Sequence, residues 1–83
     1  MCAGAGHGLL DEVLAQKVDL FLTGELPHHD ALKAAASRVT VVCALHSNSE
    51  RATLRRLAAR LATDAPGVSF LVSAADRDPF SLR

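Results

Sequence analysis

The sequence contains no tryptophan, no tyrosine and only three phenylalanines among its 83 residues. Aromatic side chains bury more apolar area than any others, so this chain has few large anchors for a core. A domain of such a size buries only about 60% of the surface that its unfolded chain exposes. We therefore expect a fold that is marginally stable on its own or that depends on a partner.

Net charge is also absent, because nine Lys and Arg residues balance nine Asp and Glu residues. Without a global basic field, direct binding to nucleic acid is not expected. The longest apolar run, residues 39–45, is far shorter than the roughly 20 residues that cross a bilayer, so no membrane association is expected. Residues 1–15 show no basic segment followed by an apolar stretch, so no secretory signal is expected either.

Cysteine is scarce as well. Cys2 and Cys43 form neither a CxxC pair nor the dense pattern of a disulfide scaffold. We interpret both as reduced thiols, which predicts a cytoplasmic protein, with the nucleus and the mitochondrion as alternatives.

The residues that are present describe a globular chain. Apolar residues make up 49% of it and charged residues 22%, which is typical of a folded domain. We interpret residues 1–83 as a single domain in which helical and strand patterns alternate. Helices are predicted over 9–17, 27–37 and 49–63, and strands over 18–22, 39–45 and 68–72.

Strands that alternate with helices of this length call for right-handed crossovers. The predicted fold class is α/β: layered, with a mainly parallel or mixed three-stranded sheet and three helices. Three strands make a poor sheet, and a glycine-rich loop such as residues 2–8 normally follows a strand. We therefore expect a fragment of a larger α/β domain. The side chains predicted to pack on the sheet follow helical spacing: Leu10, Val13, Leu14, Leu32, Ala35, Leu54, Leu57 and Leu61.

The segment His46-Ser47-Asn48-Ser49-Glu50 is the sharpest candidate for chemistry, because it follows the best predicted strand. His46 and Glu50 are four residues apart, so an imidazole and a carboxylate can converge on one metal ion. The alternative is a capping box, in which Ser47 caps the helix and Glu50 reaches back to the Ser47 amide. Spacing alone leaves both interpretations open.

Two further clusters have structural alternatives of their own. His28 and His29 are adjacent at a helix start and point about 100° apart, so only one of them need face a cleft; exposed histidines at a helix end are the alternative. On the third predicted helix, four arginines follow one another closely. Because no aromatic residues lie between them, we interpret them as a solvated face: Arg51, Arg55, Arg56 and Arg60.

Five motifs together resemble the C-terminal portion of the NIF-three-like family, whose members are also known as GTP cyclohydrolase I type 2 homologs. In chain order they are Cys2-Ala3-Gly4-Ala5-Gly6, Phe21-Leu22-Thr23-Gly24-Glu25-Leu26, His28-His29-Asp30-Ala31, His46-Ser47-Asn48-Ser49-Glu50-Arg51 and Asp76-Arg77-Asp78-Pro79-Phe80. The resemblance covers essentially the whole chain, and the HSNSER wording resembles the eukaryotic branch.

The resemblance implies an α/β fold, assembly into a ring hexamer, and a site for two divalent metal ions. His46 and Glu50 match the last two ligands of the family pattern, which favours ligation over capping. Glu25, His28 and His29 match a segment near the pocket that lines it without binding the metal directly. The other family ligands, a His-His pair and an Asp, are not matched in this chain. Zinc, iron and manganese are not distinguished, and His7 stands where relatives tend to have a small residue.

Two functions follow from the resemblance. In the first, the full-length parent is a metal-dependent hydrolase of unknown substrate, in which two ions polarise a substrate oxygen and activate water. In the second, the fold is a non-catalytic protein-interaction module linked to transcriptional regulation, in the manner of a corepressor, with protein partners. Because His46 and Glu50 alone cannot complete a site, we expect the isolated 83 residues to bind metal weakly and to be inactive.

Overall fold

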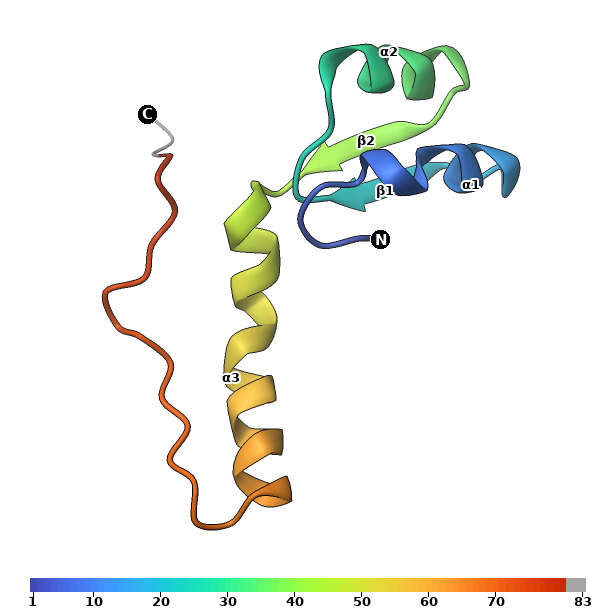
Figure 1. Ribbon diagram of the computed structural model, residues 1–83. Helices are drawn as coiled ribbons and strands as arrows, with labels where there is room; N and C mark the ends of the chain where they lie inside the picture. The colour runs from blue at the N-terminus through green and yellow to red at the C-terminus, as the bar shows by residue number, and fades with distance from the viewer. Residues whose placement is uncertain (81–83) are drawn as a thin grey trace.

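The computed structural model describes residues 1–80 and has an α/β architecture (Figure 1). A short 3-10 helix, η1 (His7–Leu9), leads into α1 (Leu10–Ala15). Strand β1 (Leu20–Thr23), helix α2 (His28–Ala36), strand β2 (Thr40–Cys43) and helix α3 (His46–Asp64) follow in that order. The predicted α/β class with three helices is therefore confirmed.

Strands β1 and β2 form a two-stranded parallel sheet in which Leu20 pairs with Thr40 and Thr23 with Cys43. Side chains alternate between the two faces of a strand, so Phe21 and Thr23 point to one face together. Both are buried. Helix α2 is the crossover that parallel strands need, and it ends where Arg38 turns the backbone with a φ of 62°.

The core lies between one face of this sheet and helices α1 and α2. Its buried members are Leu10 from α1, Phe21 from β1, Ala34 from α2 and Val39 just before β2. Val13 and Leu14 pack against this cluster, as predicted, together with Val41. The opposite face of the sheet is open in the described residues, where Leu20 is 55% exposed and Val42 43% exposed.

The prediction for α2 was wrong in its rotation. Leu32 is 58% exposed and Ala35 is also exposed, whereas Asp30 and Ala34 face inward. Residues four apart lie on one face of a helix, so the inward stripe is offset from the one that Leu32 and Ala35 define. The polar Asp30 has a partner on this inward face, because its buried carboxylate accepts a hydrogen bond from the His7 ring at the start of η1.

The third predicted strand, residues 68–72, is not part of the sheet, so the three-stranded prediction was wrong for this chain. Helix α3 carries the chain away from the sheet over 19 residues, about 28 Å at the rise of an α-helix. The chain turns at Gly67 and runs back beside α3 as an extended segment (Figure 1). Residues 68–72 therefore lie beside the helix and far from β2.

The apolar stripe of α3 consequently meets this returning segment and not the sheet. Leu54, Leu57 and Leu61 line one open groove of about 290 Å³ together with Phe70 and Val72. No residue of α3 is fully buried, and Leu57 is 51% exposed. The prediction that these leucines pack on the sheet was wrong, because the helix leaves the sheet at its first turn.

A different segment lies along the free edge of β1. The Cys2 amide donates to the Leu22 carbonyl at 2.9 Å, and the Glu25 amide donates to the Gly4 carbonyl at 3.0 Å. Ala5 and Glu25 form a parallel bridge. The glycine-rich start of the chain thus extends the pairing of the sheet by a few residues, and this places Gly4 beside the carboxyl ends of β1 and β2.

Candidate functional site

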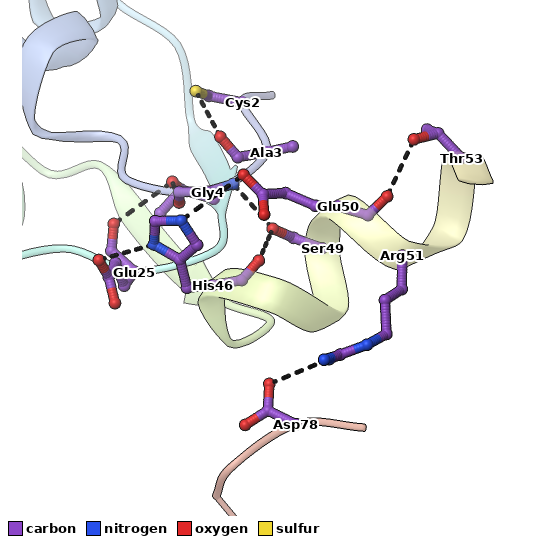
Figure 2. A network of polar contacts seen from close by, with 11 residues as sticks. Cys2, Ala3, Gly4, Glu25, His46, Ser49, Glu50, Arg51, Thr53 and Asp78 are labelled. Atoms are coloured by element: carbon purple, nitrogen blue, oxygen red, sulfur yellow. Dashed lines mark hydrogen bonds and ion pairs between the residues drawn. The ribbon is translucent and has the colours of Figure 1, made fainter. Parts of the chain in front are cut away.

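Three segments meet at the carboxyl end of the sheet, and their meeting defines the candidate site (Figure 2). They are the glycine-rich start, the residues after β1, and the first turn of α3. The Gly4 amide donates a hydrogen bond to Ser49 Oγ at 2.8 Å, and Ser49 Oγ donates in turn to the His46 carbonyl at 2.6 Å. Ser49 therefore joins the first segment to the start of α3.

Glycine is required where these segments cross. Gly4 has a φ of 68°, and a Cβ there would lie 2.9 Å from Glu50 Oε1 and 3.3 Å from His46 Nε2. A Cβ on Gly24 would lie 2.5 Å from the Gly4 carbonyl oxygen and 2.6 Å from Ser49 Oγ. Only residues without a side chain let the backbone approach the His46 and Glu50 side chains this closely.

His46 and Glu50 point toward one another from one face of α3, and Gly4 lies beside both side chains (Figure 2). His46 Nε2 lies 3.5 Å from Glu50 Oε1, and His46 Nδ1 lies 2.8 Å from Glu25 Oε1. The predicted convergence of His46 and Glu50, with Glu25 nearby, is therefore present in the structure. Whether these residues bind a metal stays a prediction.

Glu25 shapes the electrostatics of this cluster. Its hydrogen bond to the ring raises the pKa of His46 above the ordinary 6.5; partial burial opposes the rise, and the negative charges of Glu25 and Glu50 add to it. The hydrogen bond at Nδ1 has a second consequence, because it fixes which ring nitrogen is free. In the neutral ring, with Nδ1–H donating to Glu25, the lone pair of Nε2 points toward Glu50.

This donor set fits two positions of a metal shell. Ligand atoms bound to one zinc ion in tetrahedral geometry are about 3.4 Å apart, and His46 Nε2 and Glu50 Oε1 are separated by 3.5 Å. A ligating histidine usually donates its other ring N–H to a carboxylate, which is the position of Glu25. No group of three or more His, Cys, Asp and Glu side chains is arranged to hold a metal within residues 1–80. The cluster therefore brings together two candidate donor side chains, His46 and Glu50, and one neighbouring carboxylate, Glu25.

The capping-box alternative was wrong. Helix α3 begins at His46, three residues earlier than predicted, with Leu45 as the preceding residue. Leu45 turns the chain with a φ of 67°, and no side chain caps the helix by a hydrogen bond. Ser47 therefore lies inside the first turn, which leaves the Glu50 carboxylate free to face His46.

The other predicted residues lie outside this cluster. His28 and His29 open α2 and are exposed, and His29 Nε2 lies 3.7 Å from Asp30 Oδ1. Asp30 is the partner that the sequence did not reveal, since its buried carboxylate contacts His7 Nδ1 at 2.5 Å. The role of His28 and His29 as pocket-lining residues stays a prediction.

Arg51 was grouped with the solvated arginines, but the structure gives it partners. Its guanidinium donates to both carboxylate oxygens of Asp76, from Nε at 2.6 Å and from Nη2 at 2.9 Å. This pairing lowers the pKa of Asp76 and raises that of Arg51. Motif spacing could not reveal the contact, because the two residues are 25 positions apart.

Comparison with known proteins identifies the class to which this arrangement belongs. The family model described as Duf34/NIF3 (NGG1p interacting factor 3) matches residues 1–79. The chain belongs to this family, and the resemblance drawn from the five motifs is confirmed. No solved structure gives a significant match.

Individual relatives agree with this assignment. The chain is 41% identical over 83 residues to the mouse protein NIF3-like protein 1, a match that covers 99% of this chain and 21% of the relative. It is 39% identical over 82 residues to NGG1-interacting factor 3 of Saccharomyces cerevisiae, covering 99% of this chain and 28% of the relative. The chain thus spans between a fifth and a third of the length of these curated relatives. No helix within residues 1–80 is long and apolar enough to span a membrane.

Proposed function

We propose that this chain supplies two ligands, His46 Nε2 and the Glu50 carboxylate, to the metal centre of a NIF3-family protein. The observation that carries the proposal is the 3.5 Å separation of the two donor atoms, with Glu25 holding the opposite ring nitrogen at 2.8 Å. Glu25 accepts a hydrogen bond from Nδ1–H and so orients the ring with Nε2 toward Glu50. Gly4 leaves room above both side chains.

The reaction that best suits such a centre is metal-dependent hydrolysis of an as yet unidentified substrate. A divalent ion held there would supply Lewis-acid chemistry at a substrate oxygen. In this proposal His46 and Glu50 would hold the ion, and Glu25 orients the His46 ring. The hydrogen bond between Gly4 and Ser49 fixes the start of α3. The remaining ligands of a dinuclear site, and the larger α/β domain around it, belong to a longer protein in this proposal.

A second candidate function is a protein-interaction module linked to transcription. One observation favours it: the yeast relative is named NGG1-interacting factor 3. The open sheet face with Leu20 and Val42 gives such a module apolar surface. Ring-hexamer assembly and a cytoplasmic location complete the proposal for the longer protein under either function.

Titration of the chain with zinc, followed by calorimetry, tests the first function. Weak binding is expected, and His46→Ala or Glu50→Gln should abolish it. His28→Ala is the matched control, because His28 is an exposed histidine at the start of α2. Binding that His46→Ala leaves unchanged refutes the proposed ligands. Two tightly held ions per chain would also refute it, since His46 and Glu50 cannot complete two sites.

A further inference from the structure

Arg51 is held more firmly than the other arginines of α3. It forms a two-pronged contact with Asp76, at 2.6 Å and 2.9 Å, and its Nη1 donates to Asn48 Oδ1 at 3.0 Å. Nη1 also lies 3.6 Å from Asp78 Oδ2, the ion pair drawn in Figure 2. Paired N–H groups that match both oxygens of a carboxylate fix direction as well as distance.

Arg60 on the same helix provides the contrast. It pairs with Asp64 at 3.7 Å, four residues away, and their side chains are 81% and 62% exposed. An exposed pair within one helix contributes little to stability and fixes no other segment. The Arg51 side chain is 23% exposed and that of Asp78 only 8% exposed, and both acidic partners come from the returning segment. Arg51 therefore joins two segments that are distant in sequence.

The first turn of α3 needs such a restraint. No side chain caps it, none of the helix's residues is buried, and the helix leaves the sheet at this point. Besides the Glu25 contact at His46, two restraints flank Glu50 in the sequence. Ser49 accepts the Gly4 amide, and Arg51 holds Asp76. Successive helical residues point about 100° apart, so Glu50 projects between the side chain that is joined to Gly4 and the side chain that is joined to Asp76.

We propose that Arg51 is a positioning residue: with Asp76 and Asp78 it ties the first turn of α3 to the segment that packs along the later turns of the helix, and so keeps that turn helical, with Glu50 and His46 together beside Gly4. The proposal gives a role to the Asp76-Arg77-Asp78 segment, which the site itself does not use. Its meaning for metal binding depends on the proposed function, whereas the positioning itself does not. A ligand pair held in place loses less conformational entropy on binding and binds more tightly.

The alternative is that Arg51 merely attaches the returning segment to α3. Both roles lower the melting temperature when the contact is lost, so thermal stability does not separate them. A separating measurement reports the position of His46 relative to Gly4. Its ring lies close to this glycine, since a Cβ on Gly4 would be 3.5 Å from His46 Cε1. A nuclear Overhauser effect between the Gly4 Hα and His46 Hε1 protons measures this proximity without any metal.

The test uses the whole chain with Asp76→Asn and Arg51→Lys, and Arg60→Lys as the matched control. Asp76→Asn removes the charge without altering α3, so it remains informative where Arg51→Lys weakens the helix itself. Contacts between β1 and β2 verify that the sheet is intact in each variant. In both Asp76→Asn and Arg51→Lys we expect the Gly4–His46 signal to weaken. We also expect the zinc dissociation constant to rise about 10-fold, which is the low end of the loss of affinity seen when groups that support metal ligands are replaced. Arg60→Lys should change neither quantity.

Full retention of the Gly4–His46 signal in both Asp76→Asn and Arg51→Lys overturns the positioning role, whatever happens to the melting temperature. Loss of that signal without any rise in the zinc dissociation constant overturns the link to metal binding. If the unaltered chain shows no zinc binding that depends on His46, the proposed function fails, while the proton signal still decides the role of Arg51.

Discussion

Replacement of Gly4 by alanine tests how the glycine-rich start shapes the site. The backbone there has a φ of 68°, and the added Cβ would lie 2.9 Å from Glu50 Oε1. Holding a residue other than glycine in this conformation costs on the order of 1–3 kcal/mol. The contact adds to this cost, although the Glu50 carboxylate is the end of a flexible side chain and can swing away. The expected result is a less stable chain in which Glu50 no longer faces His46.

For a domain of this length, each kcal/mol lowers the melting temperature by about 4–8 °C. Differential scanning calorimetry therefore resolves the effect. Two matched controls separate its causes. Gly67→Ala places alanine at a φ of 125° with nothing within 4 Å, so it measures backbone strain alone. Gly8→Ala has neither strain nor a neighbour within 4 Å, so it measures the change of residue alone.

Gly4→Ala should be less stable than Gly8→Ala, and of the three variants it should be the one that loses zinc binding. Gly67→Ala should keep the zinc binding of the unaltered chain, because it lies at the far end of α3. If Gly4→Ala melts at the same temperature as Gly8→Ala, the left-handed backbone at Gly4 and its contact with Glu50 are refuted together.

Two further predictions concern the histidine and the core. Glu25→Gln should lower the pKa of His46 toward 6.5, because it removes the charged hydrogen-bond acceptor that raises that pKa. A pKa that is raised in the folded state contributes stability that is fully present below pH 6.5 and is lost as the pH rises through the raised pKa. Glu25→Gln should therefore destabilise the chain more at a pH below 6.5 than at a pH above the raised pKa. Proton NMR titration of the His46 ring and urea unfolding at two pH values measure both effects, and an unchanged titration curve would contradict them. Leu10→Ala should cost about 2–5 kcal/mol, since Leu10 is 2% exposed in the core. Leu9→Ala is its control, because Leu9 is 42% exposed, and equal unfolding free energies for the two variants would contradict the described core.

Local patterns were sufficient for much of the fold. Helices and strands up to α3 were predicted from apolar spacing, and β1 and β2 pair in parallel because a helix joins them. The family was identified from motifs that need no coordinates, and its model matches residues 1–79. The convergence of His46 and Glu50 was predicted from the strand-end position of His46 and the family motif; its structural basis, that both residues lie on one face of α3, became visible only because the helix begins at His46.

The tertiary structure decided what spacing could not. Residues 68–72 have the composition of a strand, but the direction of α3 carries them away from β2, and a strand forms only where an edge is within reach. The inward face of α2 includes Asp30, whose buried carboxylate is paired with His7, a residue 23 positions earlier in the chain. The contacts of Glu25 with His46 and of Arg51 with Asp76 likewise join residues that are 21 and 25 positions apart in the sequence. Sequence spacing reports which side chains share a face of one element, whereas contacts between elements depend on the direction in which each element leaves the last.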